Sequence, residues 1–285
     1  MYTQVICEIC GSTTRAEFLR GGGALDRCVE CGHLQRDLER APAWHRDVAY
    51  GGDPTLDRAR LALTYRELAR RAPGQPGRVF EVGFGTGALL LRFAHQGSQV
   101  AGCDSEQLQA STDPRLAEQA TLWHVPIEAI DTSETYDLVY GVHVVEHVTD
   151  PLRTAQVCRE LLRPGGQVQF LTPAGDGTGP TAYGAAWWML EDPTHVRFFS
   201  AVSLTRMLEQ AGFIDVQVRR LVLDSLATDG ASLTRMVRKR AEPAGVLSSA
   251  AVLGGAALSA PFVLVMRALV PRTRTTLHVT ARRPT

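Results

Sequence analysis

Short apolar runs alternate with stretches of helical periodicity across residues 77–222. Apolar runs of this length between turn residues are typical of buried strands, and apolar positions three or four apart are typical of helices. Repeated strand, helix and strand require crossover connections and predict a mostly parallel sheet. The predicted strands are Arg78–Val82, Gln99–Asp104, Ala120–Val125, Tyr136–Gly141, Gln167–Thr172, Ile214–Val222 and, antiparallel at the end, Thr275–Thr280. Helices are expected to begin near Thr86, Glu106, Asp150 and Ala201.

A glycine-rich turn follows the first predicted strand, in the order Glu81-Val-Gly83-Phe-Gly85-Thr-Gly87. Glycines allow a tight turn and the close approach of a ligand, and the helix behind the turn presents free N–H groups. The charge of Glu81 would oppose a pyrophosphate but attract an ammonium group. Asp104, at the end of the second strand, offers a carboxylate to ribose hydroxyls. This pattern predicts a nucleotide-like cofactor at the carboxyl edge of the sheet.

The fourth strand continues as YDLVYGVHVVEHVTDP over residues 136–151, and LLRPGG follows at 161–166. Together with the glycine loop and Asp104, these segments resemble class I S-adenosylmethionine-dependent methyltransferases, of the small-molecule type related to ubiquinone-pathway enzymes. The resemblance implies a Rossmann-like, doubly wound α/β fold with a seven-stranded sheet. The cofactor-binding residues that it implies are Glu81, Gly83, Gly85, Gly87, Asp104, His143 and Tyr50.

Four of the six cysteines form two close pairs, Cys7-x2-Cys10 and Cys28-x2-Cys31. Such spacing is typical of a structural zinc site with four sulfur ligands, which leaves no position for water or substrate. A similar N-terminal module is found in sugar C-methyltransferases. We therefore predict a zinc ribbon over residues 1–40, followed by a linker and helix over 41–76 and the methyltransferase domain over 77–285. Cys103 and Cys158 are expected to be buried in the core.

The catalytic base is expected among the histidines after the fourth and fifth strands. Methyl transfer from a sulfonium requires alignment of donor and acceptor and removal of a proton from the acceptor. His195 lies in a loop with Trp187, Trp188 and two phenylalanines, a composition that suggests an apolar ligand. His195 is the first candidate and His147 the second, with a helix-capping role for Glu146–His147 as the alternative.

Residues Ala244–Met266 carry no charge and lie between basic residues. Because the two flanking strands should pair in one sheet, both ends of this stretch lie on the same side of any membrane. We therefore predict a helical hairpin that turns near Gly254-Gly255, within a hydrophobic insertion over 223–272. Packing against protein, a homodimer contact and contact with a membrane surface through 244–266 remain open.

The chain has 285 residues with 30 basic and 30 acidic side chains, which makes a nucleic-acid backbone an unfavoured partner. The paired cysteines and the absence of a leader pattern predict a cytoplasmic location, with peripheral membrane association left open. The sequence predicts methyl transfer to a small-molecule acceptor: a natural product, a sugar or a lipid-linked compound. An RNA methyltransferase that uses the ribbon to bind RNA and a non-catalytic cofactor-binding scaffold are the alternatives.

Overall fold

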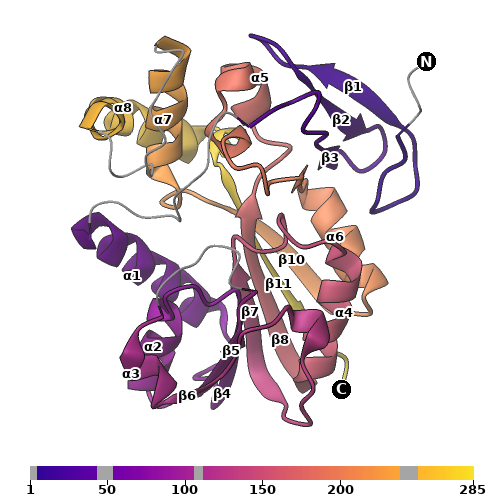
Figure 1. The fold of residues 1–285 in the computed structure, drawn as a ribbon, viewed down its shortest axis with the longest axis vertical. Helices are drawn as coiled ribbons and strands as arrows, with labels where there is room; N and C mark the ends of the chain where they lie inside the picture. The colour runs from indigo at the N-terminus through magenta and orange to yellow at the C-terminus, as the bar shows by residue number, and fades with distance from the viewer. Residues whose placement is uncertain (1–4, 44–53, 106–111, 238–249) are drawn as a thin grey trace. The chain divides into compact units, whose positions relative to one another are not determined.

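The computed structural model describes residues 5–43, 54–105, 112–237 and 250–285 (Figure 1). The chain divides into two compact units, each of which is described by itself. The ribbon unit comprises Met1–Ala59, Pro173–Leu204 and Arg219–Leu277, and the sheet unit comprises Arg60–Thr172, Thr205–Val218 and His278–Thr285. Because each unit collects three separate stretches, the units cut across the predicted segments 1–40, 41–76 and 77–285.

A seven-stranded sheet forms the core of the sheet unit, and all seven strands were predicted from the sequence. The spatial order is β10 (Ile214–Leu221), β11 (Thr276–Arg282), β8 (Leu162–Pro173), β7 (Tyr136–Val142), β4 (Arg78–Val82), β5 (Gln99–Cys103) and β6 (Ala120–Trp123). The five strands from β8 to β6 are parallel. In β4, β5, β7 and β8 the apolar residues are mostly buried on both faces, as a parallel sheet between helices requires, whereas the edge strand β6 is only partly covered.

The last strand runs against its neighbour β8. The N–H of Gly165, near the start of β8, donates to the carbonyl of Arg283, just after the end of β11, at 3.1 Å. The N–H of Arg283 donates back to Gly166 at 2.9 Å. Because the start of β8 pairs with the end of β11, the two strands are antiparallel. This confirms the predicted mostly parallel sheet with an antiparallel last strand.

Helices flank this sheet, with α2 and α4 on opposite sides of the strands in Figure 1. They are α1 (Pro54–Arg71), α2 (Ala88–His95), α3 (Pro114–Ala117), the short η1 (Ile127–Ala129), α4 (Pro151–Leu161) and α6 (Ala201–Gln210). Asp150 caps α4, because its side chain accepts a hydrogen bond from the N–H of Arg153 at 2.9 Å. The start of α4 is therefore capped by Asp150 and not by Glu146 or His147.

The ribbon unit has its own antiparallel sheet of four strands. In spatial order they are β1 (Thr14–Phe18), β2 (Ala24–Cys28), β3 (Leu34–Gln35) and β9 (Arg197–Phe198). The sequence does not reveal β9, since two residues are too few for a periodic signal. The remaining elements of the ribbon unit are α5 (Gly179–Tyr183), η2 (Gly184–Ala186), η3 (Trp188–Leu190), α7 (Leu226–Val237), α8 (Ala250–Leu269) and η4 (Pro271–Thr273).

The predicted turn at Gly254-Gly255 is wrong, because α8 runs through both glycines without a break. Packing explains them instead. A Cβ on Gly255 would lie 3.1 Å from Oγ1 of Thr234, and a Cβ on Gly230 would lie 2.6 Å from Cα of Ala256. The glycines therefore allow α7 and α8 to approach closely. Among the described residues, no helix combines the length and the apolar character that crossing a membrane requires.

Candidate functional site

The glycine loop between β4 and α2 has the backbone that its sequence predicts. Gly83, Gly85 and Gly87 all have positive φ, at 71°, 52° and 77°. A Cβ on Gly83 would lie 2.6 Å from Val144, and one on Gly87 would lie 2.1 Å from Leu116. A Cβ on Gly85 would meet no heavy atom within 4 Å. Gly83 and Gly87 therefore serve packing, whereas Gly85 leaves room for a ligand close to the backbone.

Glu81 is a buried carboxylate at the end of β4. Its register partner on β7 is Tyr140, and the Tyr140 hydroxyl donates to Oε2 of Glu81 at 2.8 Å. Burial raises the pKa of Glu81 well above its ordinary value, the Tyr140 hydrogen bond lowers it, and the charge of Asp104 raises it further. An ammonium group placed beside Glu81 would favour the ionised carboxylate and offset the cost of burying it.

Asp104 follows β5, the strand next to β4. Its Oδ2 accepts a hydrogen bond from the N–H of Gly85 at 2.7 Å, and its own N–H donates to the carbonyl of Trp123 at 3.0 Å. The carboxylate is thus tied to the glycine loop through one oxygen. Because β4 and β5 are parallel neighbours, Glu81 and Asp104 lie at the same carboxyl edge of the sheet.

His143 follows β7 at that edge in a strained conformation, with φ of 55°. Two contacts hold it there. Its N–H donates to the carbonyl of Leu171 at 2.8 Å, and its Nδ1 lies 3.2 Å from Oε1 of Glu146. The other oxygen of Glu146, which is fully buried, accepts from Oγ1 of Thr172 at 3.0 Å. Glu146 is therefore an orienting group for His143 and not a surface charge.

The other predicted residues are distributed as follows. His147 belongs to the sheet unit and is half-buried, and its N–H closes a turn onto the carbonyl of Val144 at 2.9 Å. Tyr50 lies outside the described residues. Cys103 and Cys158 are buried in the sheet unit, as predicted. Glu81, the three loop glycines, Asp104, His143 and His147 thus share one unit, and His195 and the paired cysteines belong to the other.

His195 is buried in the ribbon unit, just before β9. Its Nδ1 lies 2.7 Å from the carbonyl oxygen of Met189, which fixes Nδ1 as the protonated donor and Nε2 as the basic nitrogen of the neutral ring. Oδ2 of Asp192 lies 3.8 Å from Nε2. This environment suits a histidine that accepts a proton and is then stabilised by a nearby carboxylate.

The aromatic residues around His195 do not behave as predicted. Trp187 and Phe198 pack on each other with ring centroids 4.6 Å apart. Both belong to a buried cluster whose other members are Leu19, Leu25, Leu34, Ala41, Met189 and Leu190. Phe199 is also buried and packs on His33. The apolar surface that these side chains bind is the N-terminal ribbon itself, so the expected ligand contact is wrong for Trp187, Phe198 and Phe199.

Arg36 connects the ribbon to the loop that carries His195. Its buried guanidinium donates to four carbonyl oxygens, those of Ala41 and Leu190 at 2.7 Å and those of Asp192 and His195 at 2.7 and 3.3 Å. Burial lowers the pKa of Arg36 to about 10, so the guanidinium stays charged at neutral pH. The backbone around His195 is therefore fixed by a residue of the N-terminal ribbon.

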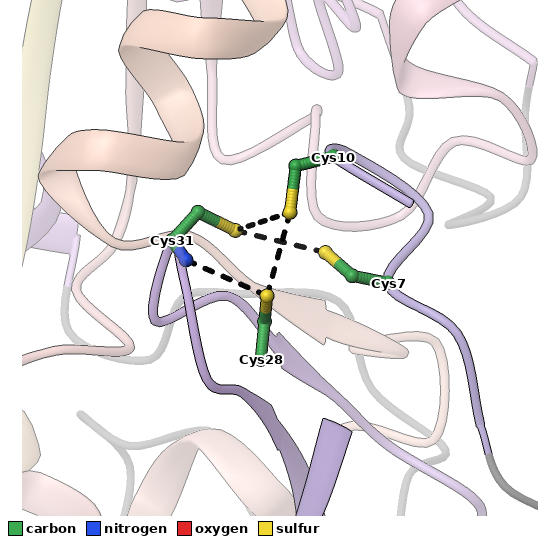
Figure 2. A group of neighbouring side chains, drawn as sticks. All are labelled: Cys7, Cys10, Cys28 and Cys31. Carbon is green, nitrogen blue, oxygen red and sulfur yellow. Dashed lines mark hydrogen bonds between the residues drawn. The ribbon is translucent and has the colours of Figure 1, made fainter. Parts of the chain in front are cut away.

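The four paired cysteines converge, with their sulfur atoms directed toward one point (Figure 2). The Sγ–Sγ distances are 3.6 Å for Cys7–Cys31, 3.4 Å for Cys10–Cys28 and 3.6 Å for Cys10–Cys31. A disulfide requires about 2.05 Å, whereas four sulfurs around one zinc at about 2.3 Å lie about 3.8 Å apart. The donor set and its spacing fit a tetrahedral metal site.

The two halves of this cluster are built alike. The N–H of Gly11 donates to the carbonyl of Cys7 at 2.9 Å, and the N–H of Gly32 donates to that of Cys28 at 3.1 Å. Both glycines have positive φ, at 69° and 70°. Each Cys-x2-Cys-Gly segment is therefore a tight turn that only glycine completes easily.

Three residues of these sites escaped the sequence reasoning: Tyr140, Thr172 and Arg36. Tyr140 and Thr172 read as ordinary strand residues, although the register of β4 and β7 would have placed Tyr140 beside Glu81. No sequence motif marks Arg36, because its partners are backbone carbonyls, which every residue provides.

Comparison with known proteins shows a family match. A profile of the methyltransferase domain family matches residues 56–218. A ubiquinone biosynthesis O-methyltransferase of Dinoroseobacter shibae is 31% identical over 179 residues, which cover 59% of this chain and 72% of that protein. One from Vibrio cholerae is 38% identical over 119 residues, which cover 39% of this chain and 48% of that protein. Neither the profile nor this comparison bears on the cysteine cluster.

Solved structures share the fold. Phosphoethanolamine N-methyltransferase 2 of Haemonchus contortus, solved with S-adenosyl-L-methionine, has a TM-score of 0.56 at 16% identity, over 78% of this chain and 53% of that one. An S-adenosylmethionine-dependent methyltransferase of Mesorhizobium loti has a TM-score of 0.52 at 18% identity, over 80% of this chain and all of that one. At these identities the likeness establishes the α/β architecture.

Proposed function

The chain belongs to the S-adenosylmethionine-dependent methyltransferases, and on that premise we propose that it methylates a small-molecule acceptor with a histidine as general base. The single observation that carries this proposal is the paired carboxylates at the carboxyl edge of β4 and β5. Glu81 is buried and bound by Tyr140, and Asp104 is bound by the loop N–H of Gly85. Glu81 favours a cationic group and Asp104 suits hydroxyl groups. Together they match the ammonium group and the ribose of the cofactor.

Each of these groups has a distinct part in binding. Glu81 attracts the ammonium group of the methionine portion, because a buried carboxylate gains most from an opposite charge. Asp104 accepts hydrogen bonds from the ribose hydroxyls. Gly85 allows the cofactor to approach the backbone, since a Cβ at this position would meet no heavy atom within 4 Å. His143, strained and held by Glu146, is the proposed contact to the acceptor at this edge of the sheet.

The bound cofactor supplies an activated methyl group, which leaves its sulfur for an oxygen or nitrogen of the acceptor. The protein has to align the acceptor and take up its proton. His195 is the proposed base, because its Nδ1 hydrogen bond to Met189 directs the basic lone pair to Nε2. Asp192 stabilises the resulting imidazolium. His147 is the second candidate for this role.

We also propose that Cys7, Cys10, Cys28 and Cys31 hold one structural zinc ion. Four thiolates complete the coordination, so the metal has no open position for substrate. Its part is to join the two cysteine turns that begin and end the β1–β2 hairpin. The core that β3 and β9 share with the loop at 187–198 adds to the stability that the metal provides.

Calorimetric titration of S-adenosylhomocysteine into the purified chain tests the central proposal. We expect binding in the wild type, and a loss of about 1–3 kcal/mol in Asp104→Ala, the cost of leaving polar groups unpaired. Asp131→Ala, which removes an exposed aspartate of the same unit, is the matched control and should bind normally. Folded wild-type protein that binds no S-adenosylhomocysteine would refute the enzyme and favour a scaffold.

A further inference from the structure

The outer face of α8 carries a continuous apolar stripe. Leu258, Phe262, Val265 and Leu269 are 86%, 69%, 55% and 74% exposed. They are spaced four, three and four residues apart, which places them on one side of a helix. Every exposed side chain among the described residues of α8 is apolar, the others being Ala250, Ala257, Pro261 and Ala268. A surface helix of a water-facing protein normally carries charge on its outer face.

The opposite face of α8 is fixed, so the stripe cannot rotate inward. Arg267 is fully buried and its guanidinium binds Oδ2 of Asp229 on α7 at 2.6 Å. It also donates to the carbonyls of Asp224 and Val222, at 2.6 and 3.1 Å. The close approach of Gly230 to α8 adds a rigid contact between the helices. The packing of α7 on α8 therefore holds the stripe on the outer face of α8.

The end of α7 also carries exposed apolar side chains. Leu233, Met236 and Val237 are exposed there, and Val237 is the most exposed of the three. The seven exposed residues of α7 and α8, which we call the α7–α8 apolar face, consist of these three and the α8 stripe. Its large side chains are exposed, and apart from the Met236 sulfur, which accepts a hydrogen bond from Nη2 of Arg20 at 3.8 Å, they offer no hydrogen-bonding group. Such a surface suits insertion into a fluid apolar phase better than a specific polar partner.

Basic residues flank this face. Arg267 and Arg235 are not among them, because they pair with Asp229 and Glu191 within the unit. Arg272, directly after α8, is exposed, and the sequence continues from Val237 into Arg238-Lys239-Arg240. Two copies of the chain joined through this face by a two-fold axis would bring like charges together. An anionic lipid surface complements both the apolar residues and the basic ones.

We propose that the α7–α8 apolar face docks on the surface of an anionic lipid bilayer, with α8 in the plane of the membrane. Leu258, Phe262 and Leu269 enter the boundary between head groups and acyl chains, and Arg272 contacts lipid phosphates. No helix of the part of the chain that the structure describes is long and apolar enough to cross the bilayer. The proposal is independent of methyl transfer, because lipid binding is measured without cofactor or acceptor.

The test is co-sedimentation of the full chain with vesicles of phosphatidylcholine alone or with added phosphatidylglycerol. We expect binding that requires phosphatidylglycerol and weakens in high salt. Phe262→Ser should reduce partitioning about tenfold, and Leu258→Ser should act similarly. Phe18→Ser removes an equally exposed aromatic from β1 and should leave partitioning unchanged. Arg272→Glu should weaken binding, whereas Arg15→Glu on β1 should not.

Three results would overturn the proposal. The intact chain fails to sediment with phosphatidylglycerol vesicles, or Phe18→Ser and Phe262→Ser reduce binding equally. In the third, the wild-type chain forms a dimer that Phe262→Ser dissociates, and neither the wild type nor the variant binds vesicles. That result would assign the face to contact with a second copy of the chain. Because all substituted side chains are exposed, thermal unfolding should be unchanged and loss of folding is easily recognised.

Discussion

The guanidinium of Arg36 donates a hydrogen bond to the carbonyl oxygen of His195 at 3.3 Å. The same group also binds the carbonyls of Asp192 and Leu190, which lie at and just before the start of the histidine's own turn. A side chain that follows β3 thus fixes the backbone of the proposed base. Arg36 is a positioning residue, since it acts through the loop and not on the acceptor.

Removal of Arg36 should destabilise the ribbon unit. Arg36→Met leaves several buried carbonyls unpaired and should lower the free energy of unfolding by about 3 kcal/mol or more. Arg36→Lys should recover only part of the lost stability, because a compact ammonium group cannot reach all four carbonyl oxygens. Urea unfolding measures both, with Arg15→Met, an exposed arginine of the same unit, as control. Equal stability of Arg36→Met and Arg15→Met would contradict this role.

The hydroxyl of Tyr140 should support cofactor binding through Glu81. Tyr140→Phe removes the hydrogen bond to a buried carboxylate and should weaken S-adenosylhomocysteine binding about tenfold. Tyr136→Phe, on the same strand but away from Glu81, is the control and should bind as the wild type does. Titration calorimetry measures both, and unchanged affinity in Tyr140→Phe would show that Glu81 does not need this donor.

Cofactor affinity should also depend on pH through Glu81. Burial raises the pKa of Glu81, so its carboxyl takes up a proton at a higher pH than an exposed glutamate does. The protonated form cannot attract an ammonium group, and affinity should fall as pH drops through the raised pKa. In Glu81→Gln the affinity should be lower and that pH dependence should disappear. A wild-type profile that matches the variant's profile would exclude Glu81 as the ammonium partner.

Substitution of the loop glycines should have two different effects, one on cofactor binding and one on stability. Gly85→Ala adds a methyl group where no protein atom lies within 4 Å, so the strain of φ at 52° should cost only about 1–2 kcal/mol of stability. Its cofactor binding should be largely lost. Gly87→Ala pushes a Cβ against Leu116 and should chiefly lower stability. Thermal unfolding and calorimetry, run on both variants, distinguish the two effects; equal profiles would contradict the assignment.

Acid stability should depend on Glu67. Its carboxyl lies 3.3 Å from Nδ1 of buried His278, and this hydrogen bond, against the opposing effect of burial, lowers the pKa of Glu67 to about 2. A lowered carboxyl pKa stabilises the fold above the unfolded value and loses that contribution as pH falls toward 2. Glu67→Gln should remove up to about 2 kcal/mol at pH 7 and flatten the acid limb of the unfolding profile. Glu118→Gln, an exposed control, should leave it unchanged.

Zinc content tests the cysteine cluster directly. The purified chain should contain one zinc per molecule, released by a thiol reagent and counted with a colorimetric chelator. Cys7→Ser should lose the metal, whereas Cys103→Ser, a buried thiol of the sheet unit, should retain it. Because zinc is counted directly, the result does not depend on activity. A wild-type chain without metal would refute the zinc proposal while leaving the cofactor site untouched.

The sheet unit was predictable because its central strands are short, mostly apolar runs. Buried parallel strands such as β4 and β7 must be apolar on both faces, and that requirement is visible in the sequence. The glycine loop and Asp104 were equally visible, since a fixed backbone geometry limits the residues allowed. The cysteine spacing predicted the cluster for the same reason.

The features that were missed depend on long-range contacts. β9 has two residues and exists only because β3 supplies a partner. The glycines in α8 were read as a turn, although helix packing explains them. Trp187 and Phe198 were read as ligand contacts, because a sequence cannot distinguish an apolar ligand from an apolar segment elsewhere in the same chain.

The pairing of β3 with β9 also sets an order of events during synthesis. Glu8, between the first two cysteines, pairs with Arg197, 189 positions later, and Cys31 accepts a hydrogen bond from Ser200, 169 positions later. Residues 1–40 therefore emerge from the ribosome long before the strand that completes their sheet has been synthesised. Contacts of such separation form slowly. Residues 1–40 therefore complete their fold only after residues 197–200 have been made, and a metal bound early would protect the four cysteines until then.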